Sequence, residues 1–127
     1  MAPGRDTEVT VDARWIGFGE IELEGRRYDH DVVVDAGVVG KRRKKASKER
    51  RGEYGHTPLT AGEALPWGGR RLIVGSGAYG SLPVTDDVFE EGERRGVEVV
   101  VLATPDALAL LRDLQPGDVF AVLHVTC

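Results

Sequence analysis

A glycine-rich loop is the first segment of this chain whose residue types suggest chemistry. Gly75-Ser-Gly-Ala-Tyr-Gly80 follows a short apolar stretch and matches the G-x-G-x-x-G pattern of dinucleotide-binding turns. In that pattern, free backbone N–H groups at a helix N-terminus face the pyrophosphate. Here Pro83 delays the next helix until about Thr85, and Asp86 and Asp87 place negative charge in its first turn. We therefore interpret the glycines as residues needed for positive φ and close packing, with a nucleotide or phosphate site as the alternative.

A run of basic side chains is the second such feature. Residues Lys41 to Arg51 contain eight basic residues and one acid, Glu49, which gives this segment a charge of +7. The whole chain carries −4, so the other residues carry −11. Charge confined to one segment indicates a local contact surface for an acidic protein or for nucleic-acid phosphates. Only Tyr54 offers an aromatic ring nearby, which favours protein over nucleic acid, and a solvated loop is the remaining alternative.

The histidines and the single cysteine are scattered along the sequence. His124 and Cys127 suggest a thiol–imidazole pair, but alternate strand residues point to opposite faces, so the pair can meet only if the strand ends before Cys127. His30 and His56 combine with His124 in no spacing that is typical of a metal site. We therefore expect no metal, no cofactor and no intrachain disulfide.

Composition indicates one small globular domain. A chain of 127 residues is long enough for one core, and 41% hydrophobic with 30% charged residues is typical of a globular protein. No apolar run approaches the roughly 18 residues that span a membrane, and the first residues lack the pattern of a signal peptide. We expect a cytoplasmic protein without membrane contact, with a single domain over residues 1–127 and a loose N-terminus at residues 1–13.

The first third of the chain is predicted to be β structure. Ile21 and Leu23 alternate with acids, which is the pattern of a half-buried strand. A second strand is expected from Arg27 to Val34, after which Asp35-Ala-Gly37 forms a turn, so the pattern indicates a β meander. Residues 41–55 have almost no apolar content, and we expect them to form a basic mobile loop within the domain.

A short segment after the basic loop carries conflicting helix signals. Thr60 and Glu63 have the spacing of a capping box. Gly62 and Pro66 nevertheless limit any helix here to about one turn.

The second half of the chain alternates strands and helices. Strands are predicted at residues 72–74, 97–102 and 119–125, with helices from Thr85 to Gly96 and from Thr104 to about Leu114. Because β-α-β crossovers are right-handed, this order predicts a parallel sheet. The expected fold class is α/β, with an N-terminal β meander packed on a β-α-β-α-β core whose central sheet is mixed and mainly parallel.

Five short motifs spread over residues 18–127 are shared with a known family. They are Tyr28-Asp-His-Asp-Val32, the Lys/Arg-rich stretch leading to Gly55-His-Thr-Pro58, Val74-Gly-Ser-Gly-Ala-Tyr-Gly80, Ala103-Thr-Pro-Asp-Ala107 and Leu123-His-Val-Thr-Cys127. Together they resemble the MTH-type small α/β domain of the adipogenesis-associated and mitochondrial complex I assembly factor three proteins. The resemblance implies a three-layer fold, no established chemistry, and relatives that help to assemble a respiratory complex. The chain departs from it after the histidine segment, where relatives have a longer helix.

Two functions from different classes follow from these residues. The leading hypothesis is a non-enzymatic interaction or assembly module, because we find neither an activated nucleophile nor paired catalytic carboxylates. The residues expected to contact its protein partner are Lys41, Arg42, Arg43, Lys44, Lys45, Lys48, Arg50 and Arg51. The alternative is a small-molecule or anion-binding protein, or a minor enzyme, with a pocket where the strands end beside the glycine loop. The residues expected to line that pocket are His56, Gly75, Gly77, Tyr79, Gly80 and His124.

Overall fold

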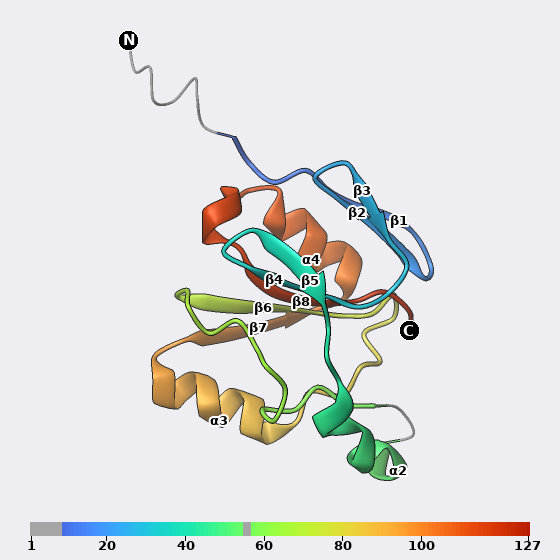
Figure 1. Ribbon diagram of the computed structural model, residues 1–127, viewed down its shortest axis with the longest axis vertical. Coiled ribbons are helices and arrows are strands. Elements are labelled where there is room, and N and C mark those ends of the chain that lie inside the picture. The colour runs from blue at the N-terminus through green and yellow to red at the C-terminus, as the bar shows by residue number, and fades with distance from the viewer. Residues whose placement is uncertain (1–8, 55–56) are drawn as a thin grey trace.

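Two β-sheets organise the chain in the computed structural model, which describes residues 9–54 and 57–127 (Figure 1). The strands are β1 (Ala13–Gly17), β2 (Glu20–Leu23), β3 (Arg26–Tyr28), β4 (Val32–Asp35), β5 (Val38–Lys41), β6 (Arg71–Ser76), β7 (Glu98–Leu102) and β8 (Phe120–His124). The α-helices are α2 (Arg51–Tyr54), α3 (Asp86–Arg95) and α4 (Thr104–Leu111), and the 3-10 helices are η1 (Lys45–Arg50) and η2 (Pro116–Asp118). β1, β2 and β3 form a small antiparallel sheet, and the other five strands form the central sheet.

The central sheet confirms the predicted topology. Its strand order is β5-β4-β8-β6-β7. β6 is parallel to both β7 and β8, whereas β4 is antiparallel to both β5 and β8. α3 connects β6 to β7, and α4 connects β7 to β8. The predicted β-α-β-α-β core with a mixed central sheet is therefore correct, but the described sheet has two parallel and two antiparallel strand pairs and is not mainly parallel.

Apolar side chains cover both faces of the central sheet. Along β8, Ala121 and Leu123 face α4 and the small sheet, whereas Val122 faces the opposite side. Leu108 of α4 is fully buried on the first side, and Val88 of α3 is fully buried on the second. Figure 1 shows the resulting three layers, with α3 on one face of the central sheet and with α4 and the small sheet on the other.

Both longer helices begin, and α3 also ends, at the residues that the sequence indicates, whereas α4 ends at Leu111 and not at the predicted Leu114. Thr85 precedes α3 in an extended conformation, and Gly96 ends it in the left-handed region at φ 70°. Pro105 lies in the first turn of α4, where its missing N–H costs no helical hydrogen bond. None of the described helices is both long and apolar enough to cross a membrane.

The continuous strand predicted from Arg27 to Val34 is wrong. β3 ends at Tyr28 in the small sheet, and β4 begins at Val32 in the central sheet. Between them the chain passes from one sheet to the other, and Asp31 becomes buried with only 8% of its surface exposed. The apolar alternation continues across this break, which is why the pattern predicts one strand.

The basic segment is also corrected, because it is helical where the sequence predicts a loop. η1 and α2 together cover residues 45–54, whereas residue 55 lies outside the described part of the chain. Ser47 of η1 is fully buried, and its backbone N–H donates to the carbonyl oxygen of Lys44 at 3.0 Å. A segment that packs through polar side chains shows no hydrophobic period, so its structure is invisible to a hydropathy pattern.

Candidate functional site: a basic pocket beside a buried ion-pair cluster

Arg42 forms the centre of a buried polar cluster. It follows β5 directly, and its Nε and Nη2 donate to the two carboxylate oxygens of Glu63, each at 2.8 Å. Its Nη1 donates to Oδ2 of Asp31 at 2.9 Å, and Nη2 also donates to the carbonyl oxygen of Pro58 at 2.9 Å. Burial alone would lower the pKa of Arg42, but the bonds to Glu63 and Asp31 raise that pKa above its ordinary value. Arg42 is thus a core residue and not the exposed partner contact that the sequence predicts.

Ser47 and Thr60 complete the cluster on the far side of Glu63. The Ser47 hydroxyl donates to Oε2 of Glu63 at 2.6 Å. Because that proton is used, the Thr60 hydroxyl donates to Oγ of Ser47 at 2.7 Å. The spacing of Thr60 and Glu63 suggested a capping box, but Glu63 holds Arg42 instead. Among the described residues, every buried side-chain nitrogen and oxygen has a hydrogen-bond partner.

Asp31 connects this cluster to the end of β8. Its Oδ1 accepts the backbone N–H of Val125 at 3.0 Å, and Oδ2 lies 2.9 Å from Nδ1 of His124. Burial would raise the pKa of Asp31, but the bonds from His124, Val125 and Arg42 outweigh it and hold the pKa at about 2. Asp31 is therefore a carboxylate at neutral pH and can only accept hydrogen bonds.

The ionised state of Asp31 decides the tautomer of His124. Because the carboxylate only accepts, Nδ1 of His124 carries a proton. In the neutral imidazole, Nε2 is therefore the acceptor, and the Thr126 hydroxyl donates to it at 3.1 Å. The His124 side chain is 15% exposed, so this imidazole reaches the surface.

A basic pocket of about 410 Å³ lies where β8 ends, and Arg42 and His124 form part of its wall. Its lining residues are Arg42, Lys44, Lys48, Arg51, Thr57, His124, Thr126 and Cys127. The helical turns η1 and α2, with the residue before them, direct Lys44, Lys48 and Arg51 to this hollow. In the part of the chain that the structure describes, no carboxylate pairs with these three cations. The pocket therefore carries a positive potential.

The glycine loop binds the chain's own last residues. The N–H of Ala78 donates to the carbonyl oxygen of Thr126 at 2.6 Å, and the N–H of Ser81 donates to that of Cys127 at 2.9 Å. The N–H of Tyr79 also points to the Cys127 oxygen, at 3.4 Å. These are the amides that a phosphate would need, so the loop has no free cradle of donors for a nucleotide.

Close packing accounts for Gly75 and Gly77. A Cβ at position 77 would lie 2.2 Å from the carbonyl carbon of Cys127. The φ of Gly77, +104°, is also a backbone conformation that residues other than glycine adopt only with strain. A Cβ on Gly75 would lie 2.9 Å from Oγ1 of Thr104. That hydroxyl accepts the N–H of Gly77 at 2.8 Å and donates to the carbonyl oxygen of His124 at 2.6 Å. The loop thus positions His124 through Thr104.

The predicted pocket residues are placed in three ways. His124 lines the basic pocket, whereas Gly75 and Gly77 pack against the segments that form its wall, and Gly80 ends the turn at φ +70°. Tyr79 is 77% exposed, and its ring lies 6.2 Å from that of Phe18. His56 lies outside the described residues.

Besides the buried Arg42, five of the predicted partner residues line one of two surface hollows, and Lys45 and Arg50 line neither. Lys44, Lys48 and Arg51 line the basic pocket. Lys41 and Arg43 line a separate, shallow hollow along β5. Lys45 is exposed at the start of η1, and Arg50 ends that helix half-buried.

Metal chemistry has no preformed site in the described part of the chain. Those residues contain no group of three or more side chains that could ligate a metal. His30 places Nδ1 3.0 Å from the carbonyl oxygen of Asp31, and its ring meets Tyr28 edge-on. The ring nitrogens of His124 bond Asp31 and Thr126 rather than the thiol of Cys127.

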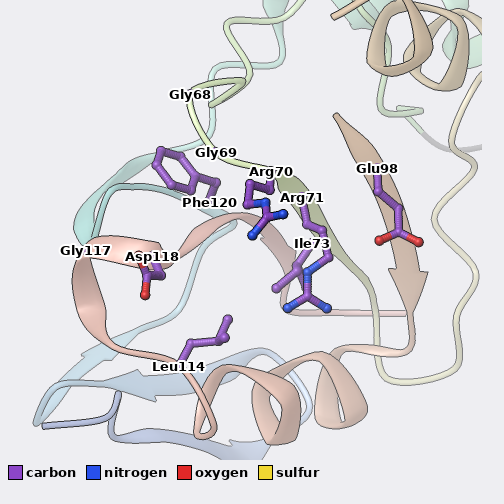
Figure 2. A pocket seen from close by; sticks show the side chains of 10 residues that line it. All are labelled: Gly68, Gly69, Arg70, Arg71, Ile73, Glu98, Leu114, Gly117, Asp118 and Phe120. Carbon is purple, nitrogen blue, oxygen red and sulfur yellow. The ribbon is translucent and has the colours of Figure 1, made fainter. Parts of the chain in front are cut away.

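A larger hollow of about 700 Å³ lies at the opposite, amino end of the parallel strands (Figure 2). Arg70 and Arg71 extend into it, and Asp118 and Phe120 lie across from them. A Cβ on Gly69 would lie 2.2 Å from Cδ2 of Phe120, so this glycine permits close packing of the wall. Asp118 and Glu98 offset the two arginines, so this hollow has weaker attraction for an anion than the basic pocket.

Sequence reasoning missed Asp31, Glu63 and Thr126 as members of the site. Asp31 lies two residues from Asp29, and Glu63 is the one acid between Tyr54 and Asp86, so only their contact with Arg42 distinguishes them. Thr126 carried a usable signal, because it lies two residues from His124 and alternate strand residues share a face.

Solved structures share this fold over nearly the whole chain. The crystal structure of the conserved hypothetical protein PH1505 from Pyrococcus horikoshii OT3 is 29% identical, covers 91% of this chain and 99% of that one, and has a TM-score of 0.76. A structure named MT938 is 26% identical, covers 95% and 100%, and has a TM-score of 0.63. An outer membrane protein from Bartonella henselae is 12% identical over 94% and 97%, and its TM-score of 0.58 shows likeness of fold alone. No protein-family model and no curated protein matches the chain.

Proposed function

We propose that this protein binds a small anionic ligand in the basic pocket. The observation that carries the proposal is the convergence of Lys44, Lys48 and Arg51 on one hollow whose described lining contains no acidic side chain. Cations that surround a concave surface concentrate anions there, because the low-dielectric wall focuses their field. From the sequence, anion binding is the alternative function, with its site expected at the glycine loop. We propose the same function for the surface beside that loop.

The wall of the pocket supports binding of a defined small molecule. The charge of Arg42 is already offset by Glu63 and Asp31, so the three exposed cations are the groups available to a ligand. Thr57 and Thr126 add hydroxyl groups to the lining. A volume of about 410 Å³ lies in the range of small-molecule sites and suits a di- or tricarboxylate or a phosphorylated metabolite.

Calorimetric titration with citrate and with inorganic phosphate tests this proposal. We expect binding that weakens with salt, and we expect the double variant Lys44→Ala/Lys48→Ala to weaken it at least about tenfold, since each charge-assisted hydrogen bond contributes about 1.5–3 kcal/mol. The matched control is Arg70→Ala/Arg71→Ala, which removes the same charge from the opposite hollow. Equal weakening by both variants, or no binding of either anion by the unaltered protein, would exclude a specific pocket.

The edge strand β5 favours a second function, contact with an acidic protein. Among the described strands, β5 pairs only with β4, and its Val38 is 72% exposed. Lys41 and Arg43 border the shallow hollow beside Val38, and Asp35 is the one acidic residue of its described lining. An open strand edge flanked by cations can receive an acidic strand from another chain. We propose this edge as the contact surface of the interaction module that the sequence predicts.

Charge reversal along β5 tests the interaction module without disturbing the core. Deletion of the whole basic segment would remove Arg42 and unfold its cluster, so we choose Lys41→Glu/Arg43→Glu. The tagged variant is expected to lose an acidic partner that the unaltered protein co-purifies. Lys44→Glu/Lys48→Glu serves as the control, and an unchanged partner set in the β5 variant would contradict this function.

We also propose that the chain belongs to the MTH-type family and shares an assembly role with its mitochondrial members. The contacts among four of the five motifs support the proposal. Asp31 of the first motif bonds His124 of the last, and Thr104 of the fourth bonds both Gly77 of the third and the His124 carbonyl. Motifs that meet at one place in the fold are more specific than the same motifs counted separately.

A further inference from the structure

We infer that Thr126, His124 and Asp31 form a nucleophilic relay through which the basic pocket hydrolyses an ester of a small anionic acid. The inference rests on the proposed anion site, because the lysines of the pocket would hold a second charged group of that acid. It adds a reaction to a site that otherwise only binds.

In successive contact, the geometry provides a nucleophile (Thr126), a base (His124) and a group that orients the base (Asp31). Oγ1 of Thr126 lies 3.1 Å from Nε2 of His124, and Nδ1 of His124 lies 3.0 and 2.9 Å from the two carboxylate oxygens of Asp31. With Nδ1 protonated toward the carboxylate, Nε2 offers its lone pair to the Thr126 hydroxyl proton. A hydroxyl that donates to a base oriented by a third group is the arrangement that activates serine and threonine nucleophiles.

Neighbouring groups hold all three members of the relay in place, and the Thr104 hydroxyl holds the carbonyl of His124 at 2.6 Å. Asp31 is fixed by the Val125 N–H at 3.0 Å and by Arg42 at 2.9 Å. The Thr126 carbonyl is held by the N–H of Ala78 at 2.6 Å. Thr126 and His124 both line the basic pocket, so a ligand there can reach the hydroxyl. The relay is therefore preorganised and open on the side where the cations lie.

The reaction balances without a metal, a redox change or another reactant besides water. The Thr126 oxygen attacks the ester carbonyl carbon while its proton moves to Nε2 of His124. The bond to the alcohol oxygen then breaks, the alcohol takes that proton, and the acyl group remains on Thr126. Water attacks the acyl group with His124 again as base, which releases the acid and restores the hydroxyl. The pocket cations stabilise the negative oxygen of each intermediate.

Acylation by mono-4-nitrophenyl terephthalate tests the inference. This rigid ester carries a free carboxylate that cannot attack its own ester bond. After an acid quench, mass spectrometry should find one 4-carboxybenzoyl group at position 126, also in Thr126→Ser and in the control Thr10→Val, which removes an exposed hydroxyl outside the pocket. The group should be absent from Thr126→Val and His124→Gln that retain the thermal melting of the unaltered protein. No acylated Thr126, or equal acylation in Thr126→Val, would overturn the inference.

A neutral ester separates this inference from the proposed anion site. With the anionic ester, the acylation rate of Lys44→Ala/Lys48→Ala should fall at least about tenfold, and with 4-nitrophenyl benzoate, which has no carboxylate for the lysines to hold, it should fall by a clearly smaller factor. If the lysine variant lost acylation rate by the same factor with both esters, the result would support Thr126 as the nucleophile and contradict the anion site. Citrate binding without any acylation would contradict the nucleophile and leave the anion site supported.

Discussion

Arg42 shows how one charged side chain can organise a core. It belongs to a run of eight basic residues, yet its side chain is 1% exposed and bonded to both Glu63 and Asp31. Truncation would leave two buried carboxylates without their shared cation, so Arg42→Ala should lower the free energy of unfolding by about 3–5 kcal/mol. The exposed neighbour Arg43→Ala should change it by less than about 0.5 kcal/mol. Urea denaturation of both variants checks this contrast, and equal effects would contradict it.

Asp31 should make the stability of the fold depend on acid. Its pKa is about 2 in the folded chain against the ordinary 3.8, so the ionised form is favoured by folding. The stabilisation is complete above pH 4 and is lost as the pH falls toward 2, where the loss reaches about 2 kcal/mol. Unfolding measured from pH 5 to 2 should therefore decline more steeply for the unaltered protein than for Asp31→Asn. Parallel declines would show that Asp31 does not titrate in this range.

At the scale of elements, the glycine loop holds Thr126 and Cys127 in place by backbone hydrogen bonds and close packing. Gly77→Ala would place a methyl group against the Cys127 carbonyl at φ +104°, so we expect a loss of at least about 2 kcal/mol of stability. Gly17→Ala is the control, because a Cβ there would contact nothing within 4 Å. Thermal unfolding compares the two variants. A Gly77→Ala protein as stable as the Gly17→Ala protein would contradict the packing interpretation.

The elements also show where pattern reasoning succeeds. α3 and α4 were predictable because Thr85, Gly96 and Pro105 mark their ends by local chemistry. η1 was not predictable, because its contact with the core is a buried hydroxyl, that of Ser47, rather than an apolar stripe. A hydropathy pattern reports burial of apolar surface and cannot report a polar side chain that is buried against a carboxylate.

At the scale of the whole molecule, the order of strands and helices predicted the central sheet, but the site required the folded chain. Asp31, Arg42, Glu63 and His124 come from distant parts of the sequence and meet only because β4 and β8 are neighbours and β5 lies next to β4. Their residue types suggest separate surface charges. Only the pairing of the strands reveals that the acids neutralise Arg42, while Lys44, Lys48 and Arg51 face the pocket.

Phosphate titration followed by amide NMR shifts tests the central claim, that the anion site is the basic pocket. The account predicts saturable shifts at the amides of Lys44, Lys48, Thr126 and Cys127, which disappear in Lys44→Ala/Lys48→Ala but persist in Arg70→Ala/Arg71→Ala. Shifts confined to the hollow around Arg70 and Arg71, or no saturable shift at either place, would contradict it.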